Sequence, residues 1–482
     1  MMPTDTLLFT PVLPEIFVLT MACVVLLVDV YLKEEQREFT YTLCQWTLMG
    51  AVLVTTITLS TAPVITFYGH FIKDAMGDIL KLGIYLSTAL VFLYSRDYLK
   101  DRGLFKGEYY ILGLFAVLGM MVMVSAHSLL SLYLGLELFS LSTYALVAFH
   151  RDSSSAAEAA IKYFVLGALA SGMLLYGISM MYGATASLDI SEIAVAVSER
   201  GSEDLVLVFG LVFLVVGIAF KFGAVPFHMW IPDVYQGAPT SVALFIGSAP
   251  KLAAFAMTMR LLANGLEPLH ADWHQMLVVL SLLSIGTGNL LAIAQSNIKR
   301  MLAYSTISHV GFLLLGVLAG TDNGYAAAMF YTLTYVLMVT AAFGIILLLS
   351  RGGLEVENIR DLRGLNEYNS WLAFLMLLAM MSMAGIPLLV GFYAKLAVFQ
   401  AVVSVGLVWL AVYGVIFSVI GVFYYLRVVK VMYFDKPEQV ITVELPNDLQ
   451  YAISANGLLI LILGLFPAIL MSLCEKAFQL GL

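Results

Sequence analysis

The strongest constraint on this chain is a succession of apolar runs, each about 20 residues long, the length that a helix needs to cross roughly 30 Å of hydrocarbon. Lipid offers no hydrogen-bond partner to an open backbone, so such runs have to be helical. The sequence therefore predicts an all-α polytopic membrane protein. Fourteen runs begin near Pro11, Thr40, Ala75, Tyr109, Leu129, Ala160, Leu205, Thr240, Trp273, Ile298, Gly324, Trp371, Leu407 and Tyr451.

Composition supports this class. Apolar residues make up 61% of the 482 residues and charged residues 12%, against about 45–50% and about 25% in soluble domains. The three cysteines, Cys23, Cys44 and Cys474, are far apart and favour neither a disulfide framework nor a metal site. No nucleotide, flavin, iron-sulfur or zinc motif occurs. We therefore expect no metal, no redox centre and no nucleic-acid partner for this chain.

Two of the predicted spans contain both Gly and Pro. Gly223 and Pro226 interrupt the seventh, and Gly385 and Pro387 interrupt the twelfth. These residues free backbone groups, and broken helices at membrane depth usually line a cavity. Their spacing predicts two inverted five-helix repeats with broken helices 7 and 12. The predicted segments are an N-terminal three-helix segment, two repeats and a C-terminal helix, at 1–108, 109–272, 273–436 and 437–482.

The 24 Lys and Arg predict the orientation. With both termini outside, sixteen of them fall in inside loops, as the positive-inside rule requires. No positive charge precedes Lys33, so we expect a retained first helix, not a cleaved signal peptide. A bacterial inner membrane with both termini periplasmic is expected. The outside segments would hold Lys73, Arg200, Arg260 and Lys476, and the spans Lys81, Lys221, Lys251 and Lys395.

Charges inside the spans are the candidate functional residues. Glu137 lies near the middle of the fifth span, and Lys221 lies one turn before the first break. Lys251 lies in the eighth span and Lys395 beyond the second break. A charge at this depth costs several kcal/mol unless it has a partner or a wet cavity. Carriage of protons fits better than the alternatives, a purely structural carboxylate or a lysine reaching the interface. Glu137 is the only deep acid that the pattern reveals, which favours protons over metal cations.

Polar side chains near these charges predict a proton relay. His309 lies in the tenth span, and His228 follows the first break. Histidine and hydroxyl groups can support a chain of water, although hydroxyls also join membrane helices by ordinary hydrogen bonds. The further relay candidates are Tyr304, Ser305, Ser308, Thr332 and Tyr335.

Several of these motifs carry a family resemblance. The run from Lys221 through Pro226-Phe-His228-Met-Trp230-Ile-Pro232-Asp233 to Gly237-Ala-Pro239-Thr240, with Asn297-Ile-Lys299-Arg300-Met-Leu-Ala-Tyr304-Ser305 and Ser308-His309-Val-Gly311, resembles the antiporter-like subunits of respiratory complex I. Within that family, the subunit N members are similar at Leu13-Pro14-Glu15, Asp29, Lys251 and Gly385-Ile-Pro387 to Tyr393-Ala-Lys395.

The resemblance implies a proton-translocating subunit of NADH:quinone oxidoreductase. It implies an ion-pair module at Glu137 and Lys221, a central relay at Lys251 and an exit-side lysine at Lys395. NADH, FMN, iron-sulfur clusters and quinone would belong to partner subunits. The implied neighbours are subunit M, subunit K, the lateral helix of subunit L and the lipid bilayer. The alternative is a subunit of a multi-component cation/proton antiporter or of a membrane-bound hydrogenase.

Overall fold

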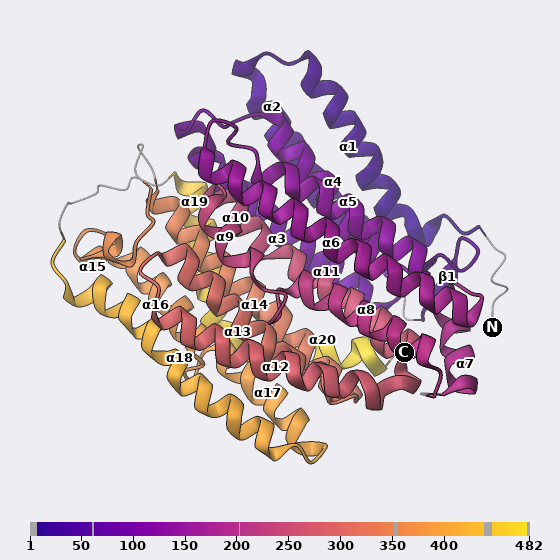
Figure 1. The fold of residues 1–482 in the computed structure, drawn as a ribbon. Coiled ribbons are helices and arrows are strands. Elements are labelled where there is room, and N and C mark those ends of the chain that lie inside the picture. The colour runs from indigo at the N-terminus through magenta and orange to yellow at the C-terminus, as the bar shows by residue number, and fades with distance from the viewer. Residues whose placement is uncertain (1–6, 60–61, 202, 351–354, 438–445, 480–482) are drawn as a thin grey trace.

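The computed structural model describes residues 7–59, 62–201, 203–350, 355–437 and 446–479. Apart from one short hairpin, the described chain is built of helices that lie side by side (Figure 1). Twelve of these are long and apolar enough to span a membrane. The two other predicted spans correspond to α2 (Arg37–Ile57), which is more polar, and to a pair of shorter apolar helices, α16 (Ser370–Ala384) and α17 (Val390–Ser404). The predicted all-α membrane fold is confirmed.

The N-terminal part contains three long helices and the hairpin. Strands β1 and β2 pair antiparallel between the second and third of these helices. Its elements are η1 (Thr10–Val12), α1 (Leu13–Tyr31), η2 (Glu34–Gln36), α2 (Arg37–Ile57), β1 (Val64–Thr66), β2 (Phe71–Lys73) and α3 (Ala75–Asp101).

The middle of the chain forms two helical blocks, and the C-terminal helices pack against the second. The first block is α4 (Gly107–Val124), α5 (Leu129–Val147), α6 (Ser154–Thr185), α7 (Ile190–Arg200), α8 (Leu205–Phe222), α9 (Trp230–Gly237), α10 (Thr240–Gly247), α11 (Ala249–Thr258), a π-helical turn (Met259–Gly265) and η4 (Glu267–Leu269). The second block and the end are α12 (His270–Ile293), α13 (Ile298–Leu318), α14 (Asp322–Leu349), η5 (Ile359–Leu362), α15 (Leu365–Tyr368), α16 (Ser370–Ala384), α17 (Val390–Ser404), α18 (Val408–Phe434), α19 (Asn447–Leu465) and α20 (Ala468–Gln479).

Both predicted helix breaks are present and share one geometry. Gly223 follows α8 with φ +76°, and Gly385 follows α16 with φ +90°. Each glycine N–H donates to the carbonyls three and four residues earlier, and the next N–H donates five residues back. Left-handed glycine is the common way to end a helix, because it avoids the steric cost of a Cβ. The two interruptions are therefore tight, ordered helix ends.

The eighth span contains a third break that the sequence analysis did not predict. Helix α10 ends at Gly247, and α11 begins at Ala249 after a non-helical Ser248. Pro250 lacks an N–H and cannot continue the ladder of hydrogen bonds across this point. The prediction of one continuous helix from Thr240 was wrong, although Gly247-Ser248-Ala249-Pro250 carried the signal.

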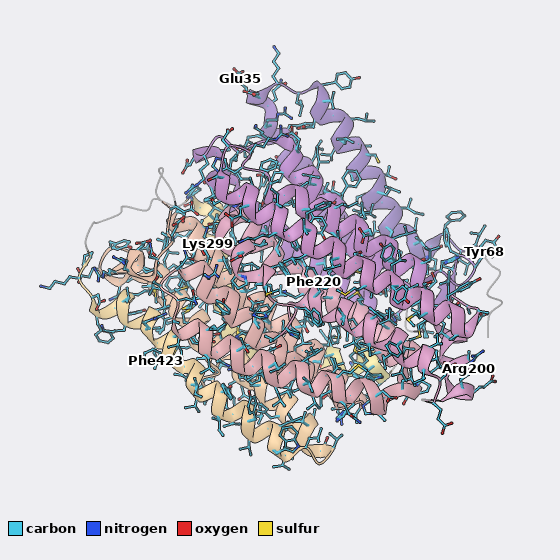
Figure 2. The ribbon with its side chains drawn as sticks, in the orientation of Figure 1. Glu35, Tyr68, Arg200, Phe220, Lys299 and Phe423 are labelled. Carbon is cyan, nitrogen blue, oxygen red and sulfur yellow. The ribbon has the colours of Figure 1, made fainter. Side chains whose placement is uncertain are left out.

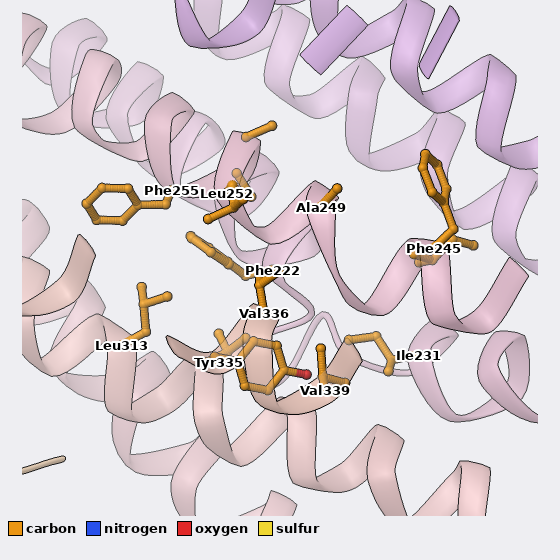
Figure 3. Close-up of a cluster of buried hydrophobic side chains, with 14 of the residues drawn as sticks. Phe222, Ile231, Phe245, Ala249, Leu252, Phe255, Leu313, Tyr335, Val336 and Val339 are labelled. Atoms are coloured by element: carbon orange, nitrogen blue, oxygen red, sulfur yellow. The ribbon is translucent and has the colours of Figure 1, made fainter. Parts of the chain in front are cut away.

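The centre of the molecule is formed by α10, α11, α13 and α14. The apolar stretches of α10–α11 and α13 are buried along their full length, whereas α1, α18 and α19 keep wide apolar faces exposed. Figure 2 shows Phe220 inside the bundle, with Glu35 and Arg200 at opposite edges. In Figure 3, Phe222 of α8, Leu252 of α11 and Val336 of α14 converge. A helix that is apolar all round belongs inside, so lipid meets the outer helices only.

Candidate functional site

The first candidate pair lies between α5 and α8. Lys221 is buried, and its Nζ donates to Ser140 Oγ at 2.6 Å. Glu137 is half-buried and accepts a hydrogen bond from Ser171 of α6. Glu137 and Lys221 make no direct ion pair in the described part of the chain. Ser140 lies one helical turn after Glu137, so a hydroxyl stands next to both charged groups.

Lys251 donates a hydrogen bond to the backbone at the first helix break. The side chain is 2% exposed, and Nζ donates to the carbonyl oxygen of Phe222 at 2.9 Å. Phe222 is the last residue of α8, so this carbonyl has lost its partner within the helix. The ammonium also lies 5.7 Å from the centroid of the Trp230 ring. A half-helix C-terminus and an aromatic face are both favourable for a cation.

Lys395 uses the second break in the same way. Its Nζ donates to the carbonyl oxygen of Ala384, the last residue of α16, at 3.0 Å. The ammonium lies 5.0 Å from the centroid of the Phe312 ring, and the residue is 7% exposed. Two buried lysines from different parts of the chain therefore meet the C-terminal carbonyl of a broken helix.

A small cavity joins Lys221 to Lys251. Its volume is about 10 Å³, close to the roughly 10–15 Å³ that one water molecule needs. Both amines lie in the wall, so one water would have polar groups on two sides. The lining residues are Met123, Phe139, Tyr163, Lys221, Trp230, Ile246, Pro250, Lys251 and Ala254.

His309 is the centre of a buried hydrogen-bond network. Its Nδ1 lies 2.6 Å from Tyr331 Oη, and its Nε2 lies 3.1 Å from Tyr425 Oη. Tyr425 Oη is in turn 2.5 Å from Ser305 Oγ. The sequence analysis named His309 and Ser305 but missed Tyr331 and Tyr425. Their spans do contain several tyrosines, but only the packing of α14 and α18 on α13 distinguishes these two.

The other predicted relay residues lie at different places. Tyr335 donates to Thr306 Oγ1 at 2.7 Å and keeps its ring 5.1 Å from that of His309. Ser308 accepts from Asn289 at 2.7 Å. Tyr304 stacks near Arg300 and shares no hydrogen bond with this network, while His228 lies half-buried in the first break with no partner for Nδ1 in the described structure. Thr332 donates to the backbone of its own helix.

Buried acids are more numerous than the sequence analysis predicted. Glu137 is half-buried, whereas four other acids are at most 6% exposed, so the expectation of a single deep acid was wrong. They lie near helix ends, where acids usually cap a helix or contact water, so the sequence analysis did not predict that they are buried. These residues are Glu15, Asp29, Asp74 and Asp78. Within the residues described, no group of three or more His, Cys, Asp or Glu side chains could hold a metal ion.

Comparison with known proteins places these features in context. The family model described as NADH:quinone oxidoreductase/Mrp antiporter, transmembrane, matches residues 126–421. The NADH-quinone oxidoreductase subunit N of Thioalkalivibrio sulfidiphilus is 60% identical over 470 residues, covering 97% of this chain and 98% of that protein. Its counterpart in Thiobacillus denitrificans is 58% identical over 476 residues, covering 99% of each.

Solved structures agree with the fold. A chain of respiratory complex I from Thermus thermophilus with bound aureothin superposes with a TM-score of 0.83 at 31% identity, covering 95% of this chain and 98% of that one. A chain of the Mrp complex from Dietzia sp. superposes with a TM-score of 0.85 at 20% identity, covering 98% and 97%. The second likeness concerns the fold alone.

Proposed function

This chain belongs to the NADH-quinone oxidoreductase subunit N family and is a proton-translocating membrane subunit of that complex, and from this premise we propose that Glu137, Lys221, Lys251, His309 and Lys395 carry the protons. A buried ammonium is destabilised by the loss of water and stabilised by a nearby carboxylate or carbonyl. Small movements of its partners can therefore decide whether a buried lysine holds or releases its proton.

The observation that carries the proposal is the repeated lysine-to-carbonyl contact at the two breaks. Lys251 meets Phe222 O and Lys395 meets Ala384 O. A helix end that moves by about 1 Å would make or break such a hydrogen bond, because its length normally stays within 2.7–3.2 Å. The breaks would thus couple helix position to proton affinity at two places.

We assign a role to each group in the proposed path. The Glu137–Lys221 module, with Ser140 next to both, loads a proton, and Lys251 passes it on as the central relay. The proton then passes through the hydrogen-bond network of His309, Ser305 and Tyr425 towards Lys395 at the exit. The flanking relay candidates are His228, Tyr304, Ser308 and Tyr335. Each proton moved outward against the membrane potential costs about 2.3 kcal/mol per 100 mV.

The energy would come from neighbouring subunits. We propose that NADH, FMN, iron-sulfur clusters and quinone react there, and that this chain holds none of them. Its proposed neighbours are subunit M, subunit K and the lateral helix of subunit L. The wide apolar faces of α1, α18 and α19 are available for such neighbours or for lipid.

We further propose a bacterial inner-membrane location with both termini in the periplasm and the two repeats at 109–272 and 273–436. The distribution of Lys and Arg supports the orientation. The identical hydrogen bonding at the ends of α8 and α16 supports the repeats.

Replacement of Lys221 tests the assignment. Membranes carrying Lys221→Ala are assayed for NADH:quinone turnover, for ΔpH formation and for sodium transport, and assembly is checked on a native gel. Lys430→Ala is the matched control, because that lysine is 68% exposed on α18. We expect turnover and ΔpH formation to fall together in Lys221→Ala only, with the complex assembled.

The alternative function would give a different pattern. If NADH oxidation stayed normal and sodium/proton exchange were lost, the chain would act as a cation/proton antiporter subunit. If Lys221→Ala assembled and built the same ΔpH as the parent, the buried lysine would not belong to the proton path.

A further inference from the structure

Helix α3 carries a line of polar side chains from one end to the other, away from the lysines discussed above. At 27 residues, it is about 40 Å long. At steps of three or four residues, one face bears Asp78, Lys81, Tyr85, Thr88, Phe92, Ser95 and Tyr98, all of them buried. Only Phe92 is apolar. A transmembrane helix rarely buries so many polar groups, because lipid-facing or core positions favour apolar side chains.

The N-terminal end of this line is a cluster of buried ion pairs. Lys81 Nζ lies 2.5 Å from Glu15 Oε1 of α1, and both side chains are at most 7% exposed. Lys73 Nζ lies 3.8 Å from Asp78 Oδ1, and both of these side chains are buried as well. Three elements, α1, β2 and α3, thus bring four charged groups together at one end of the molecule.

Arg260 closes the cluster from the side of the eighth span. Its two terminal nitrogens donate to both oxygens of Asp74 at 2.5 and 2.8 Å, and Nε donates to Val124 O. This bidentate pair fully occupies the Asp74 carboxylate. It is the arrangement expected of an anchor that joins the start of α3 to the π-helical turn after α11.

The inner members of the cluster have a different bonding pattern. Both oxygens of Glu15, both of Asp78 and the amine of Lys81 make no aligned hydrogen bond within the described structure. Charges placed only for structure are usually saturated with hydrogen bonds, because an unsatisfied buried charge is costly. Groups that exchange protons need free lone pairs or an available proton. Glu15 and Lys81 contact each other as an ion pair, and Asp78 lies near Lys73. Their carboxylates keep lone pairs that no described donor occupies, whereas both oxygens of Asp74 are occupied by Arg260.

Along α3 the line continues through hydroxyl groups. Tyr85 Oη accepts from Thr55 Oγ1 at 3.4 Å, and one turn further Thr88 Oγ1 has no partner in the part of the chain described. Beyond Phe92, Ser95 Oγ accepts from Tyr109 Oη at 3.2 Å. From Thr88 to Ser95 the helix rises about 10 Å, so Phe92 separates two polar stretches.

The other end of the line reaches a second ionic cluster. Tyr98 Oη donates to both oxygens of Glu355 at 3.2 and 3.3 Å, and Thr240 Oγ1 donates to the same carboxylate at 2.5 Å. Lys299 Nζ lies 3.8 Å from Glu355 and is buried, whereas Glu355 itself is 25% exposed. This end therefore has access to solvent through a carboxylate.

We propose that the buried face of α3 is a second proton route, with Glu15, Asp78 and Lys81 as its proton-exchanging site and Phe92 as its apolar barrier. The Lys81 ammonium gives its proton to the carboxylate of Glu15 or Asp78, leaving a neutral amine and a carboxylic acid. The acid releases that proton to water at the Lys73 end. A proton arriving from the Glu355 end crosses the Phe92 gap when water enters between Ser95 and Thr88, and it then restores the ammonium. This inference rests on the proposed function, because the complex must drive the movement.

Two variants on α3 test the route. Lys81→Met removes the exchanging amine. Thr88→Val removes one hydroxyl and leaves a side chain of nearly the same shape and no charge. Lys100→Met is the control, since this lysine lies on the same helix but pairs with Glu38 at the surface, 40% exposed. Inside-out vesicles are used to measure protons moved per NADH oxidised, with assembly verified on a native gel. We expect fewer protons per NADH in Lys81→Met and in Thr88→Val, and the parental ratio in Lys100→Met.

The opposite results are equally clear. An assembled Lys81→Met or Thr88→Val complex with the parental ratio would overturn the route and leave the cluster as an anchor. If Lys81→Met alone fails to assemble, the charge-neutral pair Glu15→Gln with Lys81→Met replaces it under the same criterion. Lys221→Ala separates the two hypotheses. Parental turnover and ΔpH formation in that variant refute the proposed function, whereas a fall of both there, with the parental ratio of protons per NADH in both α3 variants, refutes the α3 route alone.

Discussion

At the scale of single residues, neutral acceptors take the place that a salt bridge would have. Lys221 donates to a hydroxyl, whereas Lys251 and Lys395 each donate to a backbone carbonyl. Among the residues that the structure describes, no carboxylate contacts any of the three directly. A neutral oxygen stabilises an ammonium less than a carboxylate does, because it carries only a partial charge. The proton on each lysine is therefore held less firmly than in a buried ion pair.

Ser140 provides the sharpest residue-level test. Ser140→Ala removes the hydroxyl that accepts from Lys221 Nζ, and a hydrogen bond to a charged group contributes about 1.5–3 kcal/mol. We expect proton transport to fall about ten-fold, since about 1.4 kcal/mol corresponds to one decade in rate. ΔpH formation in vesicles measures it. Ser142→Ala is the control, because that hydroxyl donates only to the Leu138 carbonyl; equal transport in both variants would contradict the prediction.

Tyr425 tests the network around His309. Tyr425→Phe keeps the ring but removes the hydroxyl that lies between His309 and Ser305. We expect a fall in protons moved per NADH, with stability reduced by about 1 kcal/mol, the usual value of one neutral hydrogen bond. Tyr413→Phe, whose hydroxyl donates to Leu282 O away from this network, should keep the parental ratio. A parental ratio in Tyr425→Phe would exclude that hydroxyl from the path.

The candidate residues that the sequence could predict were those that place a charge inside a long apolar run. Glu137, Lys221, Lys251 and Lys395 stood out because each interrupts a long apolar run. Tyr331 and Tyr425 did not, because a tyrosine is common in membrane helices and only tertiary packing brings these two hydroxyls to His309. The sequence also left the partner of Lys221 open, and packing of α5 on α8 decided it.

At the scale of elements, the helix breaks supply the hydrogen-bond partners of two buried lysines. A carbonyl can serve Lys251 or Lys395 only because the helix that carries it stops at that residue. Sequence alone predicted the breaks at Gly223 and Gly385, where Gly and Pro lie close together. It missed the break at Ser248, because Pro250 also fits the first turn of a new helix and Gly247 lies in a continuous apolar run.

Gly385 tests the geometry of one break. Gly385→Ala places a Cβ at φ +90° and about 3.0 Å from Cδ of Lys395, and the left-handed backbone alone costs roughly 1–2 kcal/mol. We expect the Lys395 side chain to be displaced and proton transport to fall, while the complex still assembles normally. Gly406→Ala has a similar φ of +84° but nothing within contact of its Cβ, so it reproduces the strain without touching the lysine. Equal proton transport in the two variants would refute the positional argument.

At the scale of the whole molecule, one end is closed by loops that hold a titratable histidine. His127, between α4 and α5, lies 3.0 Å from Ser191 Oγ and 3.7 Å from Asp189 at the start of α7. Burial lowers the pKa of His127 below its ordinary value of 6.5, and Asp189 only partly opposes this. The folded state therefore favours the neutral ring, and the unfolded state binds more protons between the two pKa values.

It follows that stability rises with pH through that window and is lost as the pH falls below about 6.5. Thermal unfolding of the purified complex between pH 7.5 and pH 5.5 would measure the loss. We expect His127→Gln to reduce the slope, whereas Ser198→Ala on α7, which removes no titratable group, should keep it. An unchanged slope in His127→Gln would assign the pH dependence to other groups.

The overall architecture was predictable because lipid imposes a simple rule on backbone and length. The helical character of the spans and two of the three breaks followed from that rule, and twelve of the fourteen predicted spans are long apolar helices in the described residues. The buried acids Glu15, Asp74 and Asp78 did not, since each lies within a turn or so of a helix start, where acids are ordinary. Only the convergence of α1, α3 and α11 removes them from water.

The small cavity between Lys221 and Lys251 has a consequence for proton leakage along the proposed path. A space of about 10 Å³ holds one water at most, too little for the continuous water file along which protons would slip back. In this structure the proposed path is therefore closed between Lys221 and Lys251. Proton transfer between these two lysines would require the space between them to widen enough for further water.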